Sequence, residues 1–198
     1  MVLKLEVRKP PEIASIAVSG GSRHDGILVG GFAIETTFDS GPKLFVGTAA
    51  VRDTNCLYAL GLVRFMKEQA RSGRNSMSVF APHRGFEMYA AEHFQTWLDR
   101  NNRNADGRVP ECFAEWKYLF TRTQDGRLKF VDDVTASAWA LDRFIKGTHL
   151  VARQAATVGE SLGVPGKLGL LASGHSLEEI GLVPPDPGPP SERGTQSD

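Results

Sequence analysis

The sequence predicts an α/β fold in which a mixed five-stranded sheet is flanked by helices. Two patterns indicate it. Three short apolar and β-branched stretches, residues 13–19, 27–37 and 43–50, follow one another with turn residues between them. Beyond them, stretches with apolar residues at three-and-four spacing alternate with two more short apolar runs. Three antiparallel strands followed by alternating helices and strands imply a mixed sheet that helices cover.

The first strand, residues 13–19, is expected near the centre of the sheet. Its apolar run ends at Gly20 and Gly21, which we interpret as a turn. Between the second and third strands, Asp-Ser-Gly-Pro at residues 39–42 is turn chemistry and predicts an antiparallel meander. The two later strands are placed at residues 76–81 and 128–131.

The helices are placed by apolar spacing and by their end signals. Asp53 or Thr54 can cap the first of them, because short polar side chains accept hydrogen bonds from the free N–H groups of a helix start. A polar loop at residues 101–108 separates the second helix from the third. The helices are expected at about residues 54–72, 86–98, 113–120 and 134–158.

Composition divides the chain into four parts. Residues 1–12 alternate apolar and polar side chains and indicate an N-terminal arm or strand rather than a signal peptide. Residues 13–158 hold the predicted sheet and helices. Residues 159–183 become rich in glycine, and Ser176 can cap one or two helical turns, so we expect a C-terminal extension with a short helix. Residues 184–198 are a Pro-rich tail without apolar side chains to bury, which predicts disorder.

Charge and cysteine usage narrow the function classes. The 23 basic and 23 acidic residues give a formal net charge of zero, so the chain lacks the broad positive field of a strong nucleic-acid binder. No apolar run approaches the ~20 residues that span a bilayer, so we expect no membrane association. Cys56 and Cys112 have no metal-ligand spacing and follow no export signal. This usage favours a reducing, cytoplasmic location.

Three strings in order resemble the ribonuclease H family, over about residues 13–156. Val18-Ser-Gly-Gly-Ser22, followed by Val29-Gly-Gly-Phe-Ala33, resembles the first strand of that family, its turn and its glycine-rich second strand. Thr54-Asn55 resembles the start of its first helix. Residues 148–156, Thr-His-Leu-Val-Ala-Arg-Gln-Ala-Ala, resemble its final helix. The resemblance implies a ribonuclease H-like sheet that binds nucleic acid on one face.

The departures from the family concern its chemistry. Active members hold two divalent ions with acidic side chains near the middle of the first strand, in the first helix, after the fourth strand and in the last helix. The matching positions here are Gly20, Tyr58 or Ala59, Pro82 and His149. None of these side chains is a good Mg²⁺ ligand. The resemblance therefore implies a degenerate catalytic site with no catalytic residues, no metal and no cofactor. A register error could hide one acid, such as Asp53 or Glu87, but the ordinary roles of those two are a helix cap and a solvated first-turn carboxylate.

Basic side chains stand near several of the lost positions. The family geometry implies that Arg23, His83, Arg84 and His149 meet at one mouth, where they would bind a phosphate backbone without metal. The ordinary alternative is that His149 packs on the sheet and Arg84 is solvated. The tryptophans could stack on bases, but their helical spacing indicates core packing. They are Trp97, Trp116 and Trp139.

Three functions remain open at this point. The leading hypothesis is a catalytically inactive ribonuclease H-like domain that binds nucleic acid, or a protein that handles nucleic acid, through the former substrate face. The first alternative is a protein-protein interaction or self-assembly module, which zero net charge favours. The second is an active metal-dependent nuclease with a displaced site. The fold alone does not decide among them.

Overall fold

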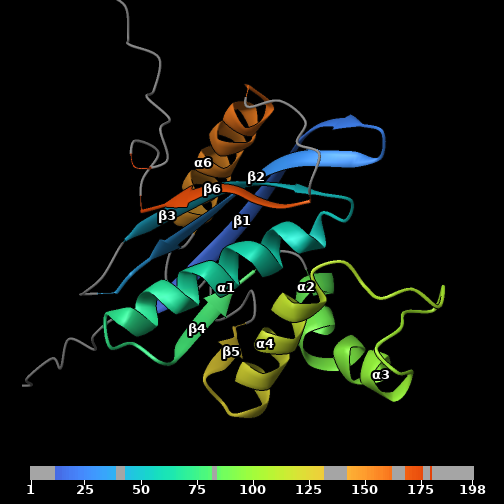
Figure 1. The fold of residues 1–198 in the computed structure, drawn as a ribbon. Coiled ribbons are helices and arrows are strands. Elements are labelled where there is room, and N and C mark those ends of the chain that lie inside the picture. Colours follow the sequence, from blue (N-terminus) through green and yellow to red (C-terminus); the bar gives the residue numbers. More distant parts are fainter. Residues whose placement is uncertain are drawn as a thin grey trace, which may run out of the picture.

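The computed structural model describes residues 12–38, 43–81, 84–131, 142–161, 168–175 and 179. Six strands form one sheet in the order β5-β4-β1-β2-β3-β6 (Figure 1). The strands are β1 (Ile13–His24), β2 (Ile27–Thr36), β3 (Leu44–Val51), β4 (Met77–Phe80), β5 (Leu128–Phe130) and β6 (Gly169–Gly174). The helices are α1 (Asn55–Arg71), α2 (Arg84–Met88), the π-helix η1 (Tyr89–His93), α3 (Phe94–Asp99), α4 (Phe113–Gln124) and α6 (Asp142–Ser161).

The predicted mixed sheet is confirmed. β1, β2 and β3 form an antiparallel meander, while β4 pairs with β1 in parallel and β5 pairs with β4 in parallel. β1 is an inner strand, as expected, because it has β2 on one side and β4 on the other. Parallel neighbours need crossover connections, and the helical segments between β1, β4 and β5 supply them.

The turn expected at Gly20 and Gly21 is wrong. β1 continues to His24, with a register irregularity between Gly20 and Arg23, and the hairpin turns at Asp25 and Gly26. Both turn residues have positive φ, 48° and 77°. Asp-Gly at positive φ is the two-residue turn whose twist matches that of paired strands. Gly20 and Gly21 therefore lie within β1, where their lack of a side chain leaves room for residues of neighbouring elements.

The C-terminal extension supplies a strand that the sequence did not predict. Residues 169–174 pair antiparallel with β3, at Thr48 and its neighbours, and make a sixth strand. Of the short helix expected at residues 176–180, only Glu179 is described, and it lies in a turn. Residues 1–11 and 180–198, which include nearly all of the expected arm and the whole tail, lie outside the described residues.

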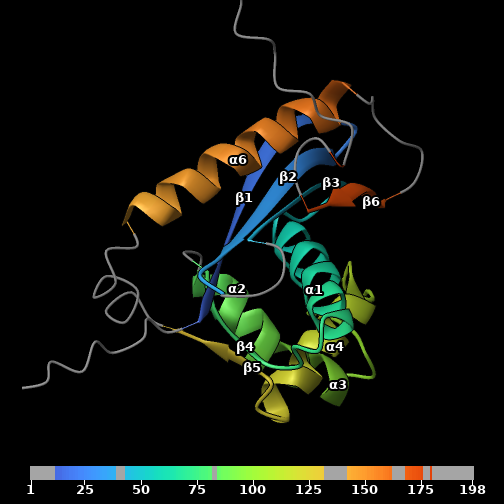
Figure 2. The ribbon, with the colours of Figure 1, turned by 90° about the vertical axis from the view of Figure 1, so that its left-hand side faces the viewer.

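The helices cover the two faces of the sheet (Figure 2). α6 lies on one face, and its small residues pack closely there: a β-carbon on Gly31 would overlap the backbone of Ala152 and Ala156. α1 lies on the other face, with α4 against it. Of α6, the expected residues 134–141 are outside the described part of the chain.

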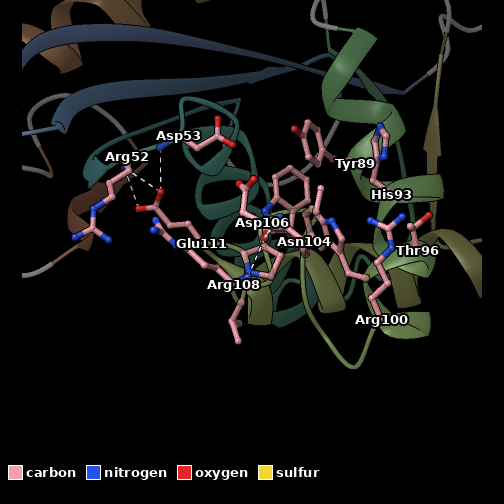
Figure 3. A pocket seen from close by; sticks show the side chains of 15 residues that line it. Arg52, Asp53, Tyr89, His93, Thr96, Arg100, Asn104, Asp106, Arg108 and Glu111 are labelled. Carbon is pink, nitrogen blue, oxygen red and sulfur yellow. Dashed lines mark hydrogen bonds between the residues drawn. The ribbon is translucent and has the colours of Figure 1, made fainter.

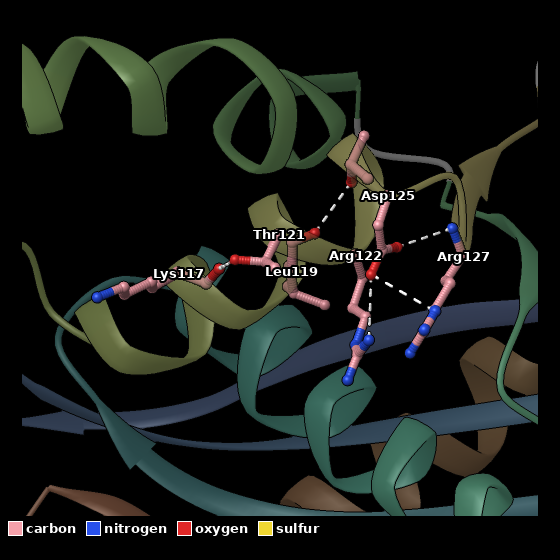
Figure 4. Close-up of polar contacts among 7 residues, drawn as sticks. Lys117, Leu119, Thr121, Arg122, Asp125 and Arg127 are labelled. Carbon is pink, nitrogen blue, oxygen red and sulfur yellow. Dashed lines mark hydrogen bonds and ion pairs between the residues drawn. The ribbon is translucent and has the colours of Figure 1, made fainter.

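The main core lies on the α1 face and is rich in aromatic residues. Trp97 and Trp116 are 8% and 1% exposed and belong to this core, which confirms core packing for those two tryptophans. Trp139 lies outside the described residues. The segment expected as one helix at 86–98 is α2, η1 and α3 in continuous succession. At the end of α4, the carboxylate of Asp125 accepts from the Arg122 guanidinium at 3.1 Å and closes the turn toward β5 (Figure 4).

Candidate functional site

The positions expected to have lost their acids lie in three different environments. Gly20 is exposed in β1, and a β-carbon there would face the side chain of Leu28. Ala59 is fully buried in α1. Tyr58 is also buried, stacks on Phe86 with ring centroids 5.0 Å apart, and has a pKa raised by burial to about 12. These two α1 positions therefore serve the core. Pro82 lies outside the described residues.

His149 is exposed on α6, at the end of the sheet away from Gly20. The hydroxyl of its neighbour Thr148 donates to the carboxylate of Glu35 at 2.9 Å. Glu35 pairs with Ser15 on β1, five residues before Gly20, or roughly 16 Å along the strand. Arg23 lies three residues further along β1. The structure therefore does not bring His149 to the mouth where the family geometry was expected to place it.

The α6 residue that does reach the glycines is Glu160. A β-carbon on Gly21 would lie 2.5 Å from the Oε1 of Glu160. Sequence reasoning missed this carboxylate, because helical periodicity fixes which face of a helix is buried and leaves open how far along the sheet the helix sits. Within the described ranges, no group of three or more His, Cys, Asp or Glu side chains is placed to hold a metal ion.

A cavity of about 510 Å³ lies beside the helix cluster on the α1 face (Figure 3). It is formed by the turn before α1, by η1 and α3, by the loop at residues 100–111 and by the start of α4. In Figure 3, Arg52 and Glu111 lie at one end of this pocket, and His93, Thr96 and Arg100 lie at the other. Its lining is Arg52, Asp53, Tyr89, His93, Thr96, Trp97, Arg100, Asn104, Ala105, Asp106, Arg108, Val109, Pro110, Glu111 and Trp116.

Glu111 fixes the loop of this pocket to the start of α1. Its two carboxylate oxygens accept hydrogen bonds from the backbone N–H of Arg52, at 2.9 Å each, and one also accepts from the N–H of Asp53 at 2.9 Å. The carboxylate of Asp53 in turn accepts from the N–H of Asn55 at 2.9 Å, while Thr54 makes no side-chain cap. Two acids of the pocket are therefore engaged with backbone groups, which confirms the capping role expected for Asp53.

Aromatic rings form one wall of the pocket. The ring of Tyr89 lies 5.0 Å from that of His93, 5.7 Å from that of Trp97 and 5.5 Å from that of Trp116. Tyr89 is half-buried, and burial raises the pKa of its phenol, with the nearby carboxylate of Asp53 adding to the effect. Its hydroxyl therefore stays protonated at neutral pH and presents an aromatic face with a polar edge.

Three arginines of the pocket have guanidinium groups without a carboxylate partner in the described part of the chain: Arg52, Arg100 and Arg108. Arg23 adjoins them, since its guanidinium donates to the backbone carbonyl of Arg52 at 3.4 Å. The hairpin tip and the pocket thus meet at the turn before α1. Of the other predicted binding residues, Arg84 begins α2 with its side chain outside the described part, and His83 is not described.

Comparison with known proteins shows the fold. No protein-family profile and no curated protein sequence matches the chain. A foamy viral protease-reverse transcriptase in complex with an RNA/DNA hybrid matches with a TM-score of 0.57 at 9% identity, over 74% of this chain and 20% of that chain. A structure described as the foamy viral protease-reverse transcriptase in complex with dsDNA matches with a TM-score of 0.57 at 10% identity, over 76% of this chain and 96% of that chain.

This chain therefore spans about a fifth of the first of these structures and nearly all of the second. The ribonuclease H domain of prototype foamy virus, solved in solution, matches with a TM-score of 0.47 at 12% identity, over 76% of this chain and 94% of that chain. The chain has a ribonuclease H-like fold. In the described residues, no helix combines the length and apolar character that crossing a membrane requires.

Proposed function

We propose that this chain is a catalytically inactive ribonuclease H-like domain that binds nucleic acid without metal, in the pocket beside α1. The observation that supports it best is an aromatic wall beside the guanidinium groups of Arg52, Arg100 and Arg108, which have no carboxylate partner among the described residues. Guanidinium groups contact phosphates through paired N–H donors, and an aromatic face accepts a sugar or an unstacked base.

The site differs in part from the four residues expected from sequence. Arg23 stays a candidate beside the pocket, because its guanidinium contacts the turn that carries Arg52. His83 and Arg84 stay candidates, since they immediately precede the helical segment that carries Tyr89 and His93. We leave His149 out of the proposed site, because α6, which carries it, lies on the opposite face of the sheet from the pocket.

The charge balance of the pocket makes such binding weak and local. Glu111 and Asp53 have carboxylates engaged with backbone N–H groups, so they oppose a phosphate less than Asp106, whose carboxylate lines the same pocket without a hydrogen bond from the described residues. Three phosphate contacts release few counterions, so log K should fall with log salt with a slope of about −2 to −3. Backbone contacts carry no base information, so binding should be indifferent to sequence. The foamy viral proteins with this fold were solved with an RNA/DNA hybrid and with dsDNA, which agrees with a nucleic-acid partner.

Fluorescence anisotropy with labelled DNA, RNA and hybrid oligonucleotides at low salt tests the proposal. Arg100→Glu and Arg108→Glu should each weaken binding at least tenfold, without lowering the melting temperature, and should reduce the salt slope by about 1. The matched control is Arg153→Glu, the same charge change at an exposed position on α6.

Two outcomes would overturn the proposal. The absence of binding to every oligonucleotide at low salt would leave the protein-interaction alternative in its place. Binding that survives both pocket substitutions and is lost in Arg153→Glu or His149→Glu would move the site to the α6 face. Chelation of divalent ions should leave the affinity unchanged, because no metal takes part.

A further inference from the structure

The only two cysteines of the chain, 56 positions apart in sequence, are brought together by the fold. Cys56 lies in the first turn of α1, and Cys112 lies directly before α4. Cys112 packs against the apolar cluster that contains Cys56, so the two thiols lie in one apolar environment. Both are free thiols in this structure.

The backbone on both sides of this pair is fixed. Glu111, the neighbour of Cys112, accepts three hydrogen bonds from Arg52 and Asp53 at 2.9 Å. The N–H of Cys56 donates to the carbonyl of Asp53 at 2.9 Å, so the same turn also positions the second cysteine. The carbonyl of Cys112 accepts from the N–H of Trp116 at 3.0 Å. Hydrogen bonds therefore hold the backbone in place at both cysteines.

Cys112 itself has a φ of 55°, which a residue with a β-carbon rarely adopts. This conformation costs about 1 kcal/mol or more and persists only where the surroundings enforce it. The bonds of Glu111 and the packing of Cys112 against both core clusters enforce it here. The position of the second thiol is thus imposed by contacts far apart in sequence.

We propose that Cys56 and Cys112 are a modification site, at which a peroxide or a small disulfide oxidises the two thiols to a reversible intrachain disulfide. With hydrogen peroxide, the sulfur of Cys112 takes one oxygen and becomes a sulfenic acid, and the peroxide is reduced to water. The sulfur of Cys56 then attacks that of Cys112, and the hydroxyl leaves with the thiol proton as a second water. Two thiols lose two electrons and two hydrogens, and the peroxide takes up both.

The two cysteines have different roles in this reaction. Cys112 is half-buried and so meets the oxidant first, whereas Cys56 is 1% exposed. Hydrogen bonding to Cys112, then burial, raises the pKa of the Cys56 thiol well above its usual range. Cys56 is therefore inert toward an external oxidant, and its attack on the sulfenic acid of Cys112 is slow, because the Cys56 thiol must first lose its proton.

A bond between these residues would lock the proposed binding pocket. Cys112 follows Glu111 and precedes Trp116 by four residues, and both of these line the pocket. The bond would close a loop of 57 residues (112 − 56 + 1) that carries nearly all of α1 together with β4, α2, η1 and α3. It would join the start of α1 to the start of α4 whatever ligand the pocket takes, so the inference does not rest on nucleic-acid binding.

The test uses the full chain, treated in its folded state with hydrogen peroxide or oxidised glutathione. The free-thiol count should fall from two to zero, the intact mass should fall by two hydrogens, and the chain should stay the same size on non-reducing gels. Dithiothreitol should reverse all three changes. Closing a loop of this length should raise the melting temperature by roughly 5–10 °C.

Two variants separate the roles of the thiols. Cys112→Ser should keep its one remaining thiol under the same treatment, because Cys56 is buried. Cys56→Ala should accumulate a sulfenic acid at Cys112 that dimedone traps. Disulfide-linked dimers of the native chain, or thiols that oxidise only after the protein is unfolded in urea, would overturn the proposal. A disulfide that forms with no change in melting temperature would overturn its locking role.

Discussion

Gly31 has no side chain at the point where α6 crosses β2, and a β-carbon there would overlap the backbone of Ala152 and Ala156. The glycine of the second strand and the alanines of the last helix, which carried the resemblance in sequence, are therefore two sides of one contact. Small residues on both sides let helix and sheet approach closely. The sequence strings that resemble the family are thus positions where helix and sheet pack closely against each other.

Tyr58 is at one of the positions where the family resemblance implies a lost acid, and it is part of the core. Burial raises its pKa from 10.0 to about 12, so the folded protein holds the phenol proton more tightly than the unfolded chain does. The stability from this difference is fully present below pH 10 and is lost as the pH rises from 10 toward 12. Two pKa units correspond to about 2–3 kcal/mol.

The Tyr58→Phe variant should therefore lose less stability than the native chain between pH 10 and pH 12. Urea denaturation at pH 8, 10 and 11.5 measures this difference. Any constant cost of removing the hydroxyl appears at every pH and cancels in the comparison. Parallel loss of stability in the two proteins would show that the phenol ionises equally well in the folded and unfolded states.

His149 and Glu160 show that the sequence did not predict which residue of α6 lies beside the glycines of β1. The alanine pattern of residues 148–156 identified the right helix and the right buried face. It could not tell which turn of α6 lies beside Gly21, because neighbouring turns repeat the same apolar spacing. Only the packing of α6 on β2 decides that, and it places Glu160 there.

Among the elements, the loop at residues 100–111 has no regular structure. The side chains of Arg103 and Asn104 make hydrogen bonds within it, and Glu111 joins it to the turn before α1. Glu111 makes three hydrogen bonds to the turn before α1, and charged acceptors make stronger bonds than neutral ones. The sequence predicted this loop and the helices around it. It did not predict the contact, since Glu111 and Arg52 are far apart in the chain and neither follows a local pattern.

Glu111→Gln should lower stability by about 1–2 kcal/mol, because an amide keeps only one acceptor oxygen for the two N–H donors, Arg52 and Asp53, that now make three hydrogen bonds. The melting temperature should fall by roughly 2–8 °C. Asp106→Asn is the matched control: it removes the same charge from the same pocket, but no side-chain bond of Asp106 is recorded among the described residues. Thermal melts of both variants give the comparison. Equal shifts would mean that charge, and not the hydrogen bonds, is responsible.

η1 illustrates a second element that sequence could not resolve. Apolar spacing predicted one helix at 86–98, and the chain is indeed helical there. Five of its residues form a π-helix, whose wider turn places Tyr89 and His93 ring to ring at 5.0 Å. Such turns are rare and often occur at functional sites. The apolar pattern continues through them unchanged, so periodicity does not reveal them.

For the molecule as a whole, the order of strands and helices could be predicted because each element carries its own period and its own turn residues. The site could not be predicted in the same way. Its residues come from the hairpin tip, the turn before α1, η1, α3 and a loop, and only the assembled fold brings these segments together. For the same reason, the sequence did not reveal that Arg23 and His149 lie toward opposite ends of β1.

The whole molecule should show no Mg²⁺- or Mn²⁺-dependent cleavage of RNA–DNA hybrid, duplex RNA or single strands. Two ions on a scissile phosphate need several carboxylates, whereas Gly20 and Ala59 offer none and Glu160 is a single acid. Gel assays with end-labelled substrates measure the activity. Cleavage that co-purifies with the folded chain and disappears in Glu160→Gln, Asp53→Asn or Glu87→Gln would establish a displaced active site instead.

The segment beyond α6 forms β6, which covers β3 at the edge of the sheet. It covers β3 along Val46–Ala50, so the N–H and C=O groups on that side of β3 have partners from the same chain. A chain that ended at residue 158, the sequence-predicted boundary, would leave this edge bare. Bare edges of apolar strands pair with one another between molecules. β6 therefore protects the chain from aggregation. Without it, the exposed edge of β3 would pair with strands of other copies.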